Sequence, residues 1–191
     1  MHKGRLEAFS DGVIAIIITI MVLEIKVPHE TGIEALYKLA PLFLSYIISF
    51  IYVGIYWNNH HHLFQSVKKV DGKVLWANLF LLFWLSLIPF VSGWMGENHF
   101  ENITVTLYGV VLFGCAVSYY LLTLSLLKTH DQESIIHKAV GNKIKEHVSL
   151  ILYIIGLGIS YWYSYIAITL FFIVALLWLL PDKRIEKQIE H

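Results

Sequence analysis

The sequence predicts an all-α polytopic membrane protein with six transmembrane helices, and three observations point to this fold class. Hydrophobic residues make up 57% of the chain, and the mean hydropathy is +0.65. Only 15% of the residues are charged, whereas soluble domains carry about a quarter. Apolar segments follow one another along the chain, most of them near the ~20 residues that a helix needs to cross a bilayer. We expect one six-helix unit over residues 1–191, with helices near residues 8–26, 39–62, 74–95, 105–127, 147–163 and 166–181.

The first predicted helix begins with a polar turn. Residues 5–12 read Arg-Leu-Glu-Ala-Phe-Ser-Asp-Gly and lead into the apolar run 13–22, in which Thr19 is the only polar residue. The run is too long and its amino end too acidic for a cleaved signal peptide. Charged groups at the entrance of a membrane helix are costly unless they are paired, so the turn indicates a function or a fixed assembly.

An apolar stripe runs along this helix. Ile16, Thr19, Ile20 and Leu23 share it, with the spacing i, i+3, i+4 and i+7. One interpretation is ordinary packing inside a helix bundle. The other is a pore: if several copies surround an axis, rings of Ile and Leu form a constriction that closes by dewetting, and a Thr ring offers oxygen to a partly dehydrated cation.

Ser10 and Asp11 lie on a different face, roughly 120–140° from Ile16. They and Arg5 allow two interpretations. Arg5 can anchor the helix at the membrane interface while Ser10 or Asp11 caps its amino end. Alternatively, the three side chains join a buried network that fixes the helix against its neighbours.

The second helix ends in a histidine run, with residues 57–64 reading Trp-Asn-Asn-His-His-His-Leu-Phe. Adjacent helical residues diverge by about 100°, whereas metal-ligand pairs on a helix sit at i, i+3 or i+4. Trp57, His61 and Phe64 share one stripe, and Asn58 lies three residues before His61. The pattern favours a hydrogen-bonded packing cluster over a metal or haem site.

The remaining helices carry few polar signals. In the third, Asn78 is placed to bond across helices, and Pro89 is placed to kink the chain. In the fourth, Cys115 lies in an apolar run, which is typical of an inert buried thiol. Only residues 163–165 separate the last two segments, which predicts a tight hairpin.

Positive charge predicts the orientation. Of the 14 Lys and Arg residues, only Lys26 and Lys38 fall on one side of the six predicted spans, and the other 12 fall on the opposite side. Because cytoplasmic loops carry the excess of Lys and Arg, both termini are expected in the cytosol of a multi-pass plasma (inner) membrane protein. The formal net charge is +0, so no basic surface for nucleic acid is expected. The expected surroundings are the lipid bilayer.

Three stretches together resemble a known family. Residues 5–24 read R-x-x-x-F-S-D-G-x-x-A-I-x-x-T-x-x-x-L-E, and residues 56–61 read Y-W-N-x-H-H. Residues 78–82 read N-L-x-x-L, followed by L-I-P-F at residues 87–90. This combination is similar to the first three helices of the transmembrane protein 175 family of potassium channels, and a single six-helix unit resembles the prokaryotic members.

The resemblance implies a homotetramer in which the first helix of each subunit lines a central pore. Ile16 would form the narrowest hydrophobic ring, Leu23 the outer one, and Ile20 a ring between them. Thr19 would be the polar layer near which potassium passes, with no cofactor and no resident metal. The resemblance further implies that a signature network faces away from the axis and locks the first helix in place, formed by Arg5, Phe9, Ser10, Asp11, Trp57, His61 and Asn78.

The leading prediction is a potassium-permeable cation channel with passive conduction, which is not an enzyme and has no catalytic residues. One alternative is a proton-coupled secondary transporter or proton-conducting protein, in which Asp11 and His61 carry protons. Another is a membrane enzyme or redox protein that uses residues 60–62.

Overall fold

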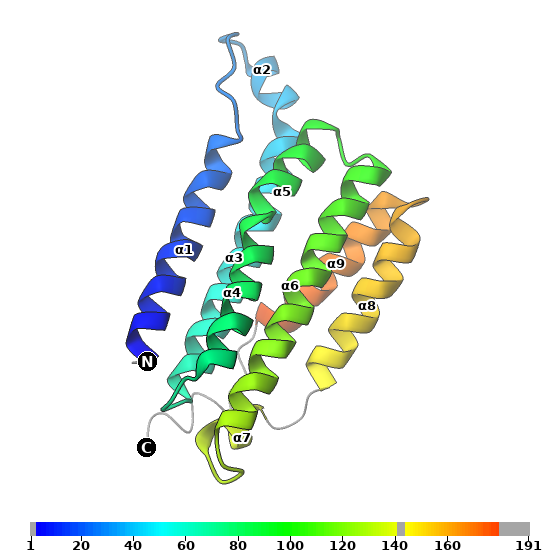
Figure 1. Ribbon diagram of the computed structural model, residues 1–191. Helices are drawn as coiled ribbons and strands as arrows, with labels where there is room; N and C mark the ends of the chain where they lie inside the picture. Colours follow the sequence, from blue (N-terminus) through cyan, green and yellow to red (C-terminus); the bar gives the residue numbers. More distant parts are fainter. Residues whose placement is uncertain (1–2, 141–143, 180–191) are drawn as a thin grey trace.

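The protein is described from a computed structural model, which covers residues 3–140 and 144–179. Within those ranges the secondary structure is entirely helical (Figure 1). The helices are α1 (Lys3–Leu23), α2 (Ile33–Lys38), α3 (Ala40–Gln65), α4 (Gly72–Ser86), α5 (Ile88–Glu97), α6 (Asn102–Thr129), α7 (Ile135–Val140), α8 (Ile144–Ser160) and α9 (Ser164–Leu179).

Four stretches of the described chain are long and apolar enough to cross a membrane. They are α1, α3, the combined run Gly72–Glu97 and α6. The last two expected segments correspond to α8 and α9, of 17 and 16 residues, which pack side by side. The turn between them lies at residues 161–163, slightly before the expected position. The end of the segment expected at 166–181 lies outside the described residues.

The segment expected as one helix near 74–95 is two helices. α4 ends at Ser86 and α5 begins at Ile88, with Pro89 in the first turn of α5. Proline has no N–H to donate, and its ring collides with the carbonyl four residues earlier, so it fits the start of a helix and interrupts its middle. The break therefore follows directly from Pro89.

The packing centres on α6, which contacts α4, α5, α8 and α9. Glycines let neighbouring helices approach closely, as membrane helices do through small residues. The Trp84 indole of α4 lies over Gly114 of α6, and the Phe171 ring of α9 lies against Gly109 of α6 and Gly156 of α8. α1 lies at one edge of the bundle, against α3, α4 and α5 (Figure 1).

Gly96 of α5 lies tightly against α3. A Cβ atom there would lie 2.6 Å from the Leu42 Cα atom. Gly96→Ala is therefore expected to lower the free energy of unfolding by about 1–3 kcal/mol, the usual range for overpacking. Thermal unfolding of the purified protein in detergent measures this loss of stability. Gly54→Ala is the matched control, since a Cβ at Gly54 would meet nothing within 4 Å. Equal stability of the two variants would contradict the close contact.

Candidate pore helix and its supporting network

Helix α1 presents one buried and one exposed face. The buried side chains follow each other at helical spacing and are Leu6, Ser10, Ile14, Ile17 and Met21. The predicted pore residues all lie on the exposed side: Ile16 is 58% exposed, Ile20 41% and Leu23 76%, and Thr19 is also exposed. A single chain thus leaves an apolar stripe of α1 uncovered.

The Thr19 hydroxyl is satisfied within its own helix. It donates to the carbonyl oxygen of Ile16 at 2.9 Å, and it also lies 3.1 Å from that of Ala15. Because the proton points back along the helix, the oxygen lone pairs are left to face outward. Thr19 is therefore an oxygen acceptor in the middle of an otherwise apolar stripe.

The buried face of α1 is held by a directional chain of hydrogen bonds. The His60 Nε2 atom lies 2.8 Å from the Asn78 Oδ1 atom, and the Asn78 Nδ2 atom donates to the Ser10 Oγ atom at 2.9 Å. The Ser10 hydroxyl in turn donates to the Leu6 carbonyl at 2.9 Å. Since an amide oxygen only accepts, the His60 Nε2 atom carries the proton. The chain joins α3, α4 and α1 through side chains that are all buried.

Sequence reasoning missed His60 and selected His61. The His60 ring packs on Phe64, with ring centroids 4.5 Å apart, so Phe64 belongs with His60 and not with the stripe of Trp57 and His61. His60 lies seven residues after Val53 and four before Phe64, and both are fully buried. That spacing was a usable signal for the inward-facing histidine.

Asp11, Trp57 and His61 form a second, more open contact. The Trp57 indole N–H donates to the Asp11 Oδ1 atom at 3.1 Å, and the Trp57 ring stacks on His61 at 6.0 Å. His61 also bonds to Gln65, with 2.7 Å between their Nε2 atoms. Trp57 is 44% exposed, so this contact lies at the edge of the α1–α3 interface.

Arg5 and Phe9 differ from the expected orientation. Both are exposed, on the same side of α1 as Ile16, whereas Ser10 is fully buried. The reason is helical geometry: Phe9 precedes Ile16 by seven residues, about two turns, and Arg5 precedes Phe9 by one further turn.

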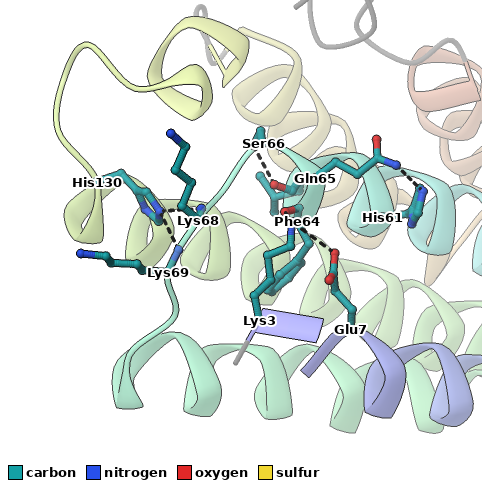
Figure 2. A network of polar contacts seen from close by, with 10 residues as sticks. Lys3, Glu7, His61, Phe64, Gln65, Ser66, Lys68, Lys69 and His130 are labelled. Atoms are coloured by element: carbon teal, nitrogen blue, oxygen red, sulfur yellow. Dashed lines mark hydrogen bonds and ion pairs between the residues drawn. The ribbon is translucent and has the colours of Figure 1, made fainter. Parts of the chain in front are cut away.

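Lys3 ties the start of α1 to the end of α3, a contact that sequence reasoning did not foresee (Figure 2). Its Nζ atom donates to the Phe64 carbonyl oxygen at 2.8 Å and lies 3.8 Å from the Glu7 Oε1 atom.

The opposite end of α1 meets α5. Glu24 lies against Gly93, and the Lys26 Nζ atom pairs with the Glu97 Oε1 atom at 2.8 Å. The hydrogen bond and the negative charge of Glu97 raise the pKa of Lys26. Between these ends, an open groove separates α1 from the α4–α5 break, lined by Val13, Ile16, Ile17, Ile20, Glu24, Ser86, Pro89 and Phe90.

The three successive histidines have three different surroundings. His60 faces Asn78, His61 faces Gln65 and Trp57, and the His62 ring contacts the edge of the His61 ring. In the part of the chain that the structure describes, no three His, Cys, Asp or Glu side chains are grouped to hold a metal ion.

The chain is similar to known channels. Residues 5–89 match the family model described as endosomal/lysosomal potassium channel TMEM175. A potassium channel of Chryseobacterium sp. (strain P1-3) is 55% identical over 191 residues, which is all of both chains. The endosomal/lysosomal proton channel TMEM175 of Gallus gallus is 30% identical over 77% of this chain and 32% of its own length.

A solved structure matches the fold. It is the crystal structure of a lysosomal potassium-selective channel TMEM175 homolog from Chamaesiphon minutus. The TM-score is 0.81 at 27% sequence identity, and the match covers 94% of this chain and 97% of the other. These relatives are channels and not enzymes.

Proposed function

Because this chain belongs to the TMEM175 family of channels, we propose that it is a potassium-permeable cation channel whose pore is formed by α1 from four identical subunits. The observation that carries the proposal is the exposed apolar stripe of α1. It contains Ile16, Ile20 and Leu23 and is left uncovered by the rest of the chain. Copies of the same stripe around a four-fold axis would cover it and enclose a narrow path.

The proposed path works by dehydration. A ring of four Ile16 side chains is too apolar to hold water in a narrow passage, so it forms a barrier that an ion crosses only by shedding part of its water. A ring of four Thr19 hydroxyls, one turn away, replaces some of the lost oxygen contacts because its lone pairs face outward. Conduction is passive and needs no cofactor, and potassium stays near Thr19 only in transit.

The contacts behind α1 support this pore by fixing the rotation of the helix. Ser10 is held by Asn78 on α4, and Asp11 is held by Trp57 on α3. A rotation of α1 by one residue position, about 100°, would break both bonds and remove Ile16 from the axis. The role that we propose for this network is to keep Ile16 facing the pore axis. The network does not contact the ion.

The proposed topology has six membrane crossings with both termini in the cytosol of the plasma (inner) membrane. It rests on the bias of 12 Lys and Arg residues against two and on the four long apolar stretches. α8 and α9 supply the last two crossings as a hairpin; at 1.5 Å per residue each is about 25 Å long, near the thickness of the hydrocarbon layer.

Flux through the purified protein in liposomes tests the function. Wild-type protein is expected to carry potassium down its gradient faster than protein-free liposomes, and to carry potassium faster than sodium. Absence of flux with intact, inserted protein would contradict the channel. A saturable proton flux, abolished by Asp11→Asn or His61→Gln, would instead favour proton transport, for which the Asp11–Trp57–His61 contact is the supporting observation.

A further inference from the structure

His130 joins the loop between α3 and α4 to the end of α6 (Figure 2). Its Nε2 atom accepts from the backbone N–H groups of Lys68 at 3.2 Å and Lys69 at 3.3 Å. Its Nδ1 atom lies 2.9 Å from the Leu126 carbonyl oxygen. One imidazole therefore connects two segments that are more than 60 residues apart in the sequence.

These partners require a neutral imidazole. A backbone N–H only donates and a backbone carbonyl only accepts, so the proton must sit on Nδ1 and the lone pair on Nε2. A second proton, on Nε2, would point at the two N–H groups and remove both hydrogen bonds. The cation would also face a loop that carries the side chains of Lys68 and Lys69.

The other charged groups nearby come from three elements. Lys128 and Asp131 flank His130 in the sequence, and Lys3 and Glu7 of α1 meet at Phe64, just before the loop. On α7, the His137 Nε2 atom lies 3.0 Å from the Leu127 carbonyl and 3.2 Å from the His130 carbonyl. Because His137 can only donate to these carbonyls, its protonation preserves the contacts. His130 differs from His137 because protonation of its Nε2 atom removes the hydrogen bonds from Lys68 and Lys69.

The loop connects to α1 on both sides. Phe64, at the end of α3, accepts from Lys3, and Asn78 of α4 donates to Ser10. Within the loop, Val67 and Val70 are buried, and the exposed residues between them are the two that His130 holds. Release of His130 would thus free the middle of the α3–α4 loop, while the helices on both sides of the loop stay hydrogen-bonded to α1.

We propose that His130 is a pH-sensitive clamp, which holds the α3–α4 loop to the end of α6 when neutral and releases it when protonated. The clamp is closed while the imidazole is neutral and accepts from the two backbone N–H groups, and it opens when acidification on the loop side of the membrane protonates Nε2. Its link to conduction rests on the proposed function, whereas the clamp itself does not.

Hydrogen exchange of the Lys68 and Lys69 amides tests the clamp in the full-length protein. Exchange is followed by mass spectrometry at single-residue resolution and corrected for the intrinsic effect of pH. Wild-type protection is expected to be lower at about pH 5.5 than at about pH 7.5. The expected fall is about tenfold, as for the loss of a hydrogen bond. Unchanged protection at the two pH values would overturn the proposal.

Three variants separate the clamp from other causes. His130→Gln keeps an acceptor oxygen and does not titrate, so its protection should be independent of pH, whereas His130→Leu should be unprotected at both values. His137→Gln should retain the wild-type response. Loss of the response in His137→Gln, or a wild-type response in His130→Leu, would overturn the assignment to His130.

Potassium flux in liposomes then tests the link to conduction. Acidification on the loop side should change the wild-type flux and leave the His130→Gln flux unchanged. A flux response that persists in His130→Gln would overturn the coupling of the clamp to the pore. Exchange measurements do not depend on conduction, so failure of the channel function and failure of the clamp remain distinguishable.

Discussion

Replacing Ile16 with asparagine is expected to raise the potassium conductance of the assembled protein by about tenfold. Each subunit would place an amide where the proposed constriction has a branched alkyl side chain, so four amides would hold water and offer oxygen to the ion. A reduction of the barrier by only about 1.4 kcal/mol is enough for a tenfold faster passage. Single-channel recording in planar bilayers, or the initial rate of liposome flux, measures the change.

The control for this substitution is Val22→Asn on the same helix. Val22 is 47% exposed but lies away from the stripe of Ile16, Ile20 and Leu23, so the same chemical change should leave the conductance near the wild-type value. Leu23→Asn should raise the conductance less than Ile16→Asn, since Leu23 forms the proposed outer ring. If both Ile16→Asn and Leu23→Asn gave wild-type currents, these residues would not line the pore.

The features that the sequence predicted well are local ones. Apolar length locates the long helices, and the 100° rotation per residue separates the exposed Ile16 from the buried Ser10 without any tertiary information. The break after Ser86 has a local cause as well, because Pro89 cannot continue a helix without losing a hydrogen bond, but from the sequence we expected only a kink in one helix.

The features that it did not predict depend on how helices face each other. Which of three adjacent histidines turns inward is set by the rotation of α3 against α4, and only that rotation brings His60 to Asn78. The contacts of Lys3 with Phe64 and of His130 with Lys68 join residues about 60 positions apart. A helical wheel describes the faces of one helix, so it cannot predict such contacts between helices. The exposure of Arg5 and Phe9 was available from the wheel, because both follow the stripe of Ile16.

Replacing Asn78 with leucine is expected to disrupt the folded and assembled protein more than a change at an exposed polar residue. Leucine has the same number of side-chain heavy atoms and the same branching at Cγ, but it leaves the Ser10 oxygen without its donor and the His60 N–H without its acceptor, both buried. The expected loss is about 2 kcal/mol, because each unsatisfied buried group costs about 1–3 kcal/mol while average hydrogen bonds inside membrane proteins contribute less. Thermal unfolding and the size-exclusion profile in detergent measure it.

A triple variant distinguishes lost hydrogen bonds from lost shape. If the damage in Asn78→Leu comes from the stranded polar atoms, then removing those atoms as well, by Ser10→Ala and His60→Phe, should recover part of the stability. If the damage comes from misfit of the leucine, the further changes should add to it. A single variant Asn78→Leu with wild-type stability and a wild-type profile would show that the buried chain does not hold α1, and the rotation of the proposed pore helix would then need another cause.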